Sequence, residues 1–229
     1  MTYGIIAALP EEQELLAKRM YITRQDEVYG TTILVGLIEG RDVVLCRCGI
    51  GKLNAALCTA LLIREYGAQA IINIGIAGAV GKGVRALDLV ISSDAVCHDV
   101  QHEIYQKYYP FKVAYEADKT LVSRAVKAAE ELGDITCHVG RIATGDWFIA
   151  DRVKKQEIVE QFHPLAVEME GGAVAYAAYL NHCPFVIIRT MSDCADEEAD
   201  ESYDNLIERA AHLSASIALK MVTEERTDR

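Results

Sequence analysis

The stretch Ala70-Ile-Ile-Asn-Ile74 decides the fold class, and Gly75-Ile-Ala-Gly78 follows it directly. A short apolar run that ends in glycines is typical of a strand buried on both faces. Phe185-Val-Ile-Ile-Arg189 predicts a second strand of this kind. Helical patterns alternate with such strands, as in Leu53 to Tyr66 and the amphipathic stretch Tyr203 to Val222. The alternation predicts an α/β fold in which helices flank a central mixed β-sheet.

Residues 1–229 are predicted to form a single domain. The length of 229 residues is within the range of one α/β domain, and the chain contains no internal repeat, low-complexity segment or linker. Turn residues between extended stretches predict a hairpin or meander over Tyr21 to Cys48. The polar and aromatic stretch Val100 to Ala117 predicts a long surface loop.

The charge balance narrows the classes of partner. The chain carries 34 acidic and 23 basic residues, a formal net charge of −11. Nucleic acids and anionic membranes bind proteins through basic surfaces, so this balance argues against both. Catalysis on a small neutral molecule remains open.

The cysteines indicate the compartment. There are seven of them, an odd number, and no two have the C-x-x-C spacing. They lie among apolar or small residues, which is typical of free, buried thiols in a reducing compartment. The sequence shows no signal-peptide pattern and no apolar run of membrane-spanning length, so we expect a cytoplasmic location.

Two motifs suggest cofactor or metal chemistry, but neither is complete. Gly49-Ile-Gly-Lys-Leu-Asn54 begins like a dinucleotide fingerprint, yet Asn54 takes the place of the third glycine and no acidic residue follows at the expected distance. A tight turn from strand to helix is the simpler interpretation. His98 and His102 have a spacing that suits a metal, but no third ligand is evident. We therefore expect no metal site and no cofactor.

Several acidic residues occupy unusual places beside the predicted strands. Glu12 comes just after the first apolar strand, Glu168-Met-Glu170 precedes a pair of glycines, and Asp193 comes just after the strand that begins at Phe185. In open α/β sheets, ligands bind at the carboxyl ends of the strands, so three such acids are candidates for one pocket. Each acid could instead stabilise the N-terminus of a helix. This alternative is weakest for Asp193, because Asp193 follows its strand directly.

Six segments in this order carry a resemblance to a known family. The chain resembles the 5′-methylthioadenosine/S-adenosylhomocysteine nucleosidases of the nucleoside phosphorylase/hydrolase superfamily, from about Met1 to Val222. The segments are Gly4-Ile-Ile-Ala-Ala-Leu-Pro-Glu-Glu12, Cys48-Gly-Ile-Gly-Lys52, Ile71-Ile-Asn-Ile-Gly-Ile-Ala-Gly78, Thr144-Gly-Asp-Trp-Phe-Ile149, Val167-Glu-Met-Glu170 and Arg189-Thr-Met-Ser-Asp193.

The resemblance implies that water cleaves an N-ribosidic bond and releases adenine and a 5-thioribose. Asp193 would protonate or hydrogen-bond N7 of the purine, which makes the base a better leaving group. Glu12 would orient and deprotonate the attacking water, and Glu170 would accept hydrogen bonds from the ribose hydroxyls. The chemistry parallels glycoside hydrolysis by two carboxylates.

The same match implies the binding residues and the partners. The resemblance assigns Phe148 and Ile149 to the binding of adenine and Met169 to the binding of the ribose. It places Ala77 and Gly78 at the floor of the pocket, and Ile50 and Tyr203 at the end that holds the 5′-thio substituent. Ser192 would lie beside the catalytic acid, and Arg189 would support the site electrostatically. The partner implied is a small purine nucleoside, with no cofactor, and the family usually forms homodimers, which the aromatic loop Tyr105 to Phe111 could join.

Three departures from the family pattern concern substrate size. Ile76 stands where a small hydroxyl residue is usual, Trp147 where a smaller residue is usual, and Val100 to Ala114 lacks the usual loop with glycine and proline. Adenosine, inosine or a futalosine-type nucleoside therefore remain alternative substrates.

Two other functions fit the same scaffold. A phosphorylase would need cations that hold phosphate, whereas Pro10-Glu-Glu12 places carboxylates at that point. A nucleoside sensor without catalysis is the other alternative, and the presence of all three acids argues against it.

Overall fold

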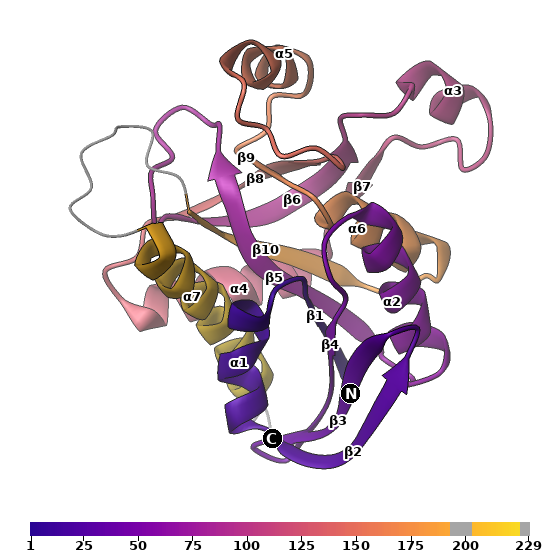
Figure 1. Ribbon diagram of the computed structural model, residues 1–229, viewed down its shortest axis with the longest axis vertical. Helices are drawn as coiled ribbons and strands as arrows, with labels where there is room; N and C mark the ends of the chain where they lie inside the picture. Colours follow the sequence, from indigo (N-terminus) through magenta and orange to yellow (C-terminus); the bar gives the residue numbers. More distant parts are fainter. Residues whose placement is uncertain (193–202, 225–229) are drawn as a thin grey trace.

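The computed structural model describes residues 1–192 and 203–224 (Figure 1). The described strands are β1 (Tyr3–Ala7), β2 (Tyr21–Val28), β3 (Thr31–Ile38), β4 (Arg41–Arg47), β5 (Ala70–Ala79), β6 (Leu89–Cys97), β7 (Ala114–Glu116), β8 (Cys137–Thr144), β9 (Ala166–Glu168) and β10 (Phe185–Met191). The described helices are α1 (Pro10–Arg19), α2 (Lys52–Arg64), α3 (His102–Lys107), α4 (Lys119–Leu132), α5 (Arg152–Phe162), α6 (Gly171–Leu180) and α7 (Tyr203–Thr223).

The strands form one mixed sheet. Parallel pairs join β4, β1, β5 and β10 in that order, and β10 pairs antiparallel with β6. From β6 the pairing continues through β8 and β9 back to β5, so these strands close a ring. The predicted α/β fold with a central mixed sheet is confirmed, and so is the meander, because β2, β3 and β4 pair antiparallel in sequence order.

Helices cover both faces of the sheet (Figure 1). Helices α2 and α6 lie on one face, while α1, α4 and α7 lie on the other. Along β5 the side chains alternate, so Ile71 packs into the core beside α2 and α6, whereas Ile72 and Ile74 pack into the core beneath α4 and α7. The predicted apolar strand is thus buried on both faces.

The predicted surface loop over Val100 to Ala117 is wrong in two places. Helix α3 forms at His102–Lys107, and β7 pairs with β6 through Tyr115 and Ala95. Helix α3 has no buried residue, so it leaves no apolar periodicity, and three-residue β7 is too short to show alternation. Helix α5 was not predicted for a similar reason, because Ile158 and Phe162 are its only buried residues.

Among the described residues, no helix combines the length and the apolar character that crossing a membrane requires.

Candidate active site

A cavity of about 270 Å³ opens at the carboxyl ends of the central strands. Its walls come from the residues after β1, the end of β5, the segments that follow β8 and β9, the end of β10 and one turn of α7. Nine of the predicted site residues line it: Glu12, Ile50, Ala77, Gly78, Phe148, Ile149, Met169, Glu170 and Ser192. Asp193 lies outside the described residues, and so does the side chain of Tyr203.

Glu12 is buried and fixed at the start of α1. Its Oε2 accepts hydrogen bonds from the backbone N–H groups of Ala8 at 2.7 Å and Leu9 at 2.9 Å, and its Oε1 accepts one from Ile76 at 3.1 Å. One carboxylate therefore caps α1 and also reaches β5, so the helix-terminus role and a role in the pocket coexist. Burial raises the pKa of Glu12 above its usual value, although Arg189 and these hydrogen bonds oppose the rise.

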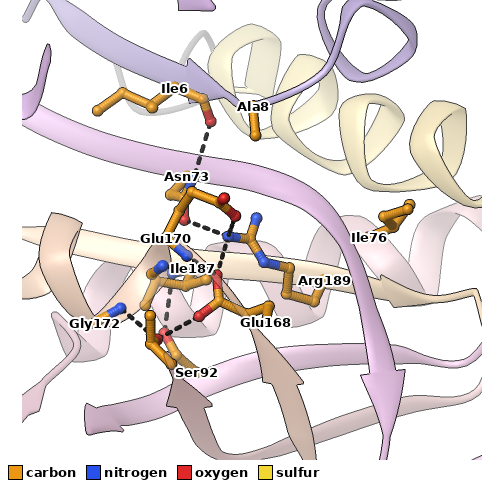
Figure 2. Close-up of polar contacts among 12 residues, drawn as sticks. Ile6, Ala8, Asn73, Ile76, Ser92, Glu168, Glu170, Gly172, Ile187 and Arg189 are labelled. Atoms are coloured by element: carbon orange, nitrogen blue, oxygen red, sulfur yellow. Dashed lines mark hydrogen bonds and ion pairs between the residues drawn. The ribbon is translucent and has the colours of Figure 1, made fainter. Parts of the chain in front are cut away.

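Arg189 lies at the centre of the site with a side chain only 1% exposed. Its Nη2 forms an ion pair with Glu168 on β9 (Figure 2). The same nitrogen donates a hydrogen bond to Asn73 Oδ1 on β5 at 2.8 Å. Asn73 Nδ2 in turn donates to the carbonyl oxygen of Ile6 at 3.0 Å. The guanidinium is thereby connected to β1, β5 and β9.

Glu168 is the carboxylate that pairs most closely with this cation. It also accepts hydrogen bonds from the Thr144 hydroxyl and from the backbone N–H groups of Glu170 at 3.0 Å and Gly171 at 2.7 Å. Burial acts to raise the pKa of Glu168, but the Arg189 charge and these hydrogen bonds outweigh it and hold the pKa below its usual value. Glu168 therefore stays ionised and serves as the counter-charge.

Glu170 faces the cavity in a different electrostatic setting. Its Oε1 accepts a hydrogen bond from Gly51 N–H at 2.8 Å, and its Oε2 lies 3.7 Å from Arg189 Nη2. Burial and the neighbouring charge of Glu168 raise the pKa of Glu170 to about 7. Two carboxylates two residues apart thus have pKa values shifted in opposite directions, a pattern typical of acid–base sites.

Gly75 allows Glu12 and Arg189 to approach each other across β5. A Cβ atom at this position would lie 2.6 Å from Glu12 Oε1 and 2.7 Å from Arg189 Nη1. The glycine that ends the apolar run therefore serves the site directly, because any side chain there would displace one of the two charged groups.

Sequence reasoning assigned no role to Asn73 or Thr144, and it named Glu168 only as part of a segment. A usable signal existed for Asn73, an amide inside an otherwise apolar strand, since such a residue needs a buried partner. Thr144 gave no such signal, because a hydroxyl residue at the end of a strand is common in any fold.

The incomplete motifs have structural roles. Gly49 and Gly51 adopt positive φ angles of 81° and 99° and form the predicted turn into α2. His102 Nε2 lies 2.7 Å from the Cys97 carbonyl oxygen, and His98 packs beneath Gly145, where an added Cβ would come within 2.3 Å of its ring. Within residues 1–192 and 203–224, no group of three or more His, Cys, Asp or Glu side chains is placed to hold a metal ion.

Comparisons with known proteins show the family to which the chain belongs. A family model described as the Phosphorylase superfamily matches residues 2–223. The 5′-methylthioadenosine/S-adenosylhomocysteine nucleosidase of Bacillus licheniformis is 37% identical to this chain over 227 residues, which cover 97% of this chain and 98% of the relative. The chain belongs to this nucleosidase family.

Solved nucleosidase structures share the fold. The enzyme from Neisseria meningitidis, in complex with methylthio-immucillin-A, is 35% identical and superimposes with a TM-score of 0.89 over 96% of this chain and 98% of its own. The Colwellia psychrerythraea enzyme, in complex with adenine, is 34% identical with a TM-score of 0.89 over 97% and 94% of the two chains. The predicted resemblance is confirmed over nearly the whole length.

Two of the departures from the nucleosidase pattern lie on the cavity itself. Ile76 and Trp147 both line it, and Trp147 is 73% exposed beside Phe148, which is 76% exposed. Both residues contribute apolar surface to the wall of the cavity.

The buried Arg189 generates a first prediction. Arg189→Met leaves Glu168 and Glu170 without their cation, so we expect it to lower the free energy of unfolding by about 3–5 kcal/mol. Urea denaturation measures this change. The matched control is Arg24→Met, which removes a surface pair with Asp26 in which the arginine side chain is 58% exposed. The control loss is about 1 kcal/mol or less; equal losses in the two variants would contradict the central role of Arg189.

Proposed function

We propose that this protein hydrolyses the N-ribosidic bond of 5′-methylthioadenosine and/or S-adenosylhomocysteine and releases adenine and a 5-thioribose. One observation carries the choice of water as nucleophile. Three carboxylates, Glu12, Glu168 and Glu170, line the cavity, and none of the described residues that line it is Lys, Arg or His. A bound phosphate would meet negative charge there with no cation to hold it.

Glu12 is the base that activates water. A carboxylate offers about four acceptor sites, and three are occupied by backbone N–H groups, so one remains for a water molecule. The same three bonds hold the carboxylate in one orientation. Its raised pKa makes it a stronger base than a solvated glutamate, which favours proton transfer from water in the transition state.

Glu170 binds the ribose. Gly51 fixes one of its oxygens, and the carboxylate remains on the cavity wall beside Met169, where it accepts hydrogen bonds from the sugar hydroxyls. Positive charge develops on the ribose as the bond to the base breaks, so a carboxylate in a buried setting stabilises that transition state.

Asp193 is the acid that assists the departure of adenine. Its predecessor Ser192 lies on the cavity, where its backbone N–H donates to the carbonyl oxygen of Ala77 at 3.0 Å. This bond fixes the end of β10 directly before Asp193, which supports the assignment. The remaining contacts follow the family match: Phe148 and Ile149 bind adenine, Ala77 and Gly78 form the floor, and Ile50 and Tyr203 border the 5′ end.

We further propose that two copies of the chain form a homodimer. Large apolar side chains are exposed around the mouth of the cavity and on α2, including Ile50, Leu53 and Phe148, at 56%, 85% and 76% exposure. Exposed apolar surface of this extent is typical of a protein interface. The aromatic residues on and after α3, exposed in this chain, are a second part of that surface: Tyr105, Tyr108, Tyr109 and Phe111.

The proposal also includes a cytoplasmic location and a single domain. Six cysteines in the described part of the chain are free thiols, which supports a cytoplasmic location. The family match over residues 2–223 supports one domain that spans residues 1–229.

The reaction is tested by adenine release in phosphate-free buffer. We expect the wild-type protein to release adenine from 5′-methylthioadenosine there, and Glu12→Gln to lower kcat by at least about 10²-fold because the water loses its base. The control is Glu11→Gln, an exposed neighbour in the same helical turn, which keeps wild-type activity. Release only after phosphate is added would assign a phosphorylase. Binding without release would assign a sensor, and preference for inosine or unmodified adenosine would correct the substrate.

The raised pKa values of Glu12 and Glu170 predict a loss of activity on the acid side. As the pH falls through the Glu170 pKa of about 7, this carboxylate takes up a proton and loses its charge and its acceptor capacity. We therefore expect kcat/KM to rise as the pH increases from about 5 to about 8. The control is Glu116→Gln, which we expect to keep the wild-type pH profile. Lys112 holds the pKa of Glu116 below its usual value, so Glu116 does not titrate in this pH range. A flat profile in the wild type would contradict the proposed roles.

The dimer is tested by sedimentation equilibrium. Leu53→Asp places a charge on the exposed apolar surface, so we expect the protein mass to fall from that of a dimer to that of a monomer. Tyr21→Asp is the matched control, since Tyr21 is 73% exposed on edge strand β2, away from the cavity. A wild-type protein that sediments as a monomer would overturn the proposal.

A further inference from the structure

Three charged residues just outside the cavity form a bridge between three segments of the chain. Lys52 begins α2, Asp99 follows β6, and Asp146 follows β8. Lys52 Nζ lies 2.6 Å from Asp99 Oδ1 and 3.6 Å from Asp146 Oδ2. Two backbone groups complete the connection: Lys52 N–H donates to Asp146 Oδ1 at 2.8 Å, and Asp146 N–H donates to Asp99 Oδ2 at 3.0 Å. We call this set the Lys52 bridge.

Within the Lys52 bridge, the Lys52–Asp99 pair is shielded more than an ordinary surface ion pair. The side chains of Lys52 and Asp99 are 19% and 17% exposed. Burial would lower the pKa of Lys52, but Asp99 outweighs it and raises that pKa, while the pKa of Asp99 is held below its usual value. The pair is therefore charged at neutral pH, and its partial burial protects it from the solvent screening that weakens exposed pairs.

One arm of the bridge leads to Glu170. Gly51 precedes Lys52 and donates its N–H to Glu170 Oε1. A Cβ on Gly51 would lie 3.2 Å from Asp146 Oδ1, so the aspartate packs closely against this glycine. The hydrogen bond from Lys52 N–H to Asp146 thus fixes the peptide next to the one that holds the ribose-binding carboxylate.

The other arm leads to the wall formed by Trp147, Phe148 and Ile149. This segment has no helix or strand, and its two aromatic side chains are mostly exposed. Its base is held at Gly145, which packs on the ring of His98 and donates its N–H to the Glu168 carbonyl oxygen at 3.1 Å. Beyond Gly145, Asp146 is the residue that connects the wall to α2 and to the end of β6.

We propose that Lys52 and Asp99 are positioning residues for the nucleoside: through Asp146 they hold the Trp147–Ile149 wall and Gly51 in the geometry that binds substrate. The inference rests on the proposed function, because that wall is the proposed adenine site. Neither residue lines the cavity, so both act through the segments that they connect.

The kinetic test compares Lys52→Met and Asp99→Asn with Lys52→Arg on 5′-methylthioadenosine. The wall contacts the nucleoside before and during the reaction, so we expect KM to rise about tenfold while kcat falls less than about threefold. Lys52→Arg keeps the charge and restores most of the affinity. The double variant of Lys52→Met and Asp99→Asn is no worse than either single variant, because both remove the same pair.

A matched control pair is available on β6 and β8, the strands that Asp99 and Asp146 follow. Arg141 on β8 pairs with Asp94 on β6 at 2.6 Å, with side chains 36% and 14% exposed. It connects those strands as the Lys52 bridge does, but neither of its residues lines the cavity or adjoins the wall. Arg141→Met therefore removes a comparable ion pair, and we expect it to leave KM unchanged.

A second readout needs no substrate. Trp147 is the only tryptophan in the chain, so its fluorescence reports on the wall alone. We expect Lys52→Met and Asp99→Asn to lower the fluorescence anisotropy of the free protein and to increase quenching by acrylamide, and Lys52→Arg and Arg141→Met to leave both unchanged.

The outcomes are distinguishable. Unchanged KM and unchanged anisotropy in Lys52→Met and Asp99→Asn overturn the inference. A fall in kcat with unchanged KM and anisotropy also overturns it, because the bridge would then act on Glu170 without positioning the wall. If the wild-type protein releases no adenine, the proposed function fails, while the anisotropy still decides whether the bridge holds the wall.

Discussion

A single buried guanidinium organises the electrostatics of this protein. Arg189 lies among Glu12, Glu168 and Glu170, so three carboxylates interact with one cation. Glu168 takes the closest pairing and has a lowered pKa, whereas burial raises the pKa of the other two. Glu12 and Glu170, which both line the cavity, are therefore more basic than solvated glutamates. The arrangement that makes Arg189 tolerable in the core is the same one that prepares the site for proton transfer.

Strand β5 provides the framework for this cluster. Ile71, Asn73, Gly75 and Ala77 share one face because side chains alternate along a strand. On that face Ile71 packs in the apolar core, and the amide of Asn73 binds Arg189. Gly75 leaves space for two charged groups, and Ala77 lines the floor of the cavity. The opposite face continues as plain core through Ile72 and Ile74. Farther along β5, residues of both faces line the cavity, because Ile76 and Gly78 lie beside Ala77 in its wall.

The sequence predicted the parts of the site that obey a local rule. Acids placed after strands meet at the carboxyl edge of the sheet, so this rule made Glu12 and the segment Glu168-Met-Glu170 candidates, and the family resemblance then selected Glu170. The pairing of Glu168 with Arg189 could not be derived in this way, because it depends on the ring closure that brings β9 and β10 to neighbouring positions around β5. Likewise, α3, α5 and β7 bury too few side chains to produce a periodic pattern.

The choice between water and phosphate follows from where the positive charges are used. Carboxylates engage both Arg189 and Lys52: Arg189 pairs with Glu168, and Lys52 pairs with Asp99. Neither is available to an anionic co-substrate without breaking a buried or shielded pair, which is costly. A neutral nucleophile meets no such penalty, and three backbone N–H groups hold Glu12, the proposed base, in one orientation. Both cations are instead used within the protein: Arg189 holds the buried carboxylates, and Lys52, in the proposed role, positions the wall of the proposed adenine site.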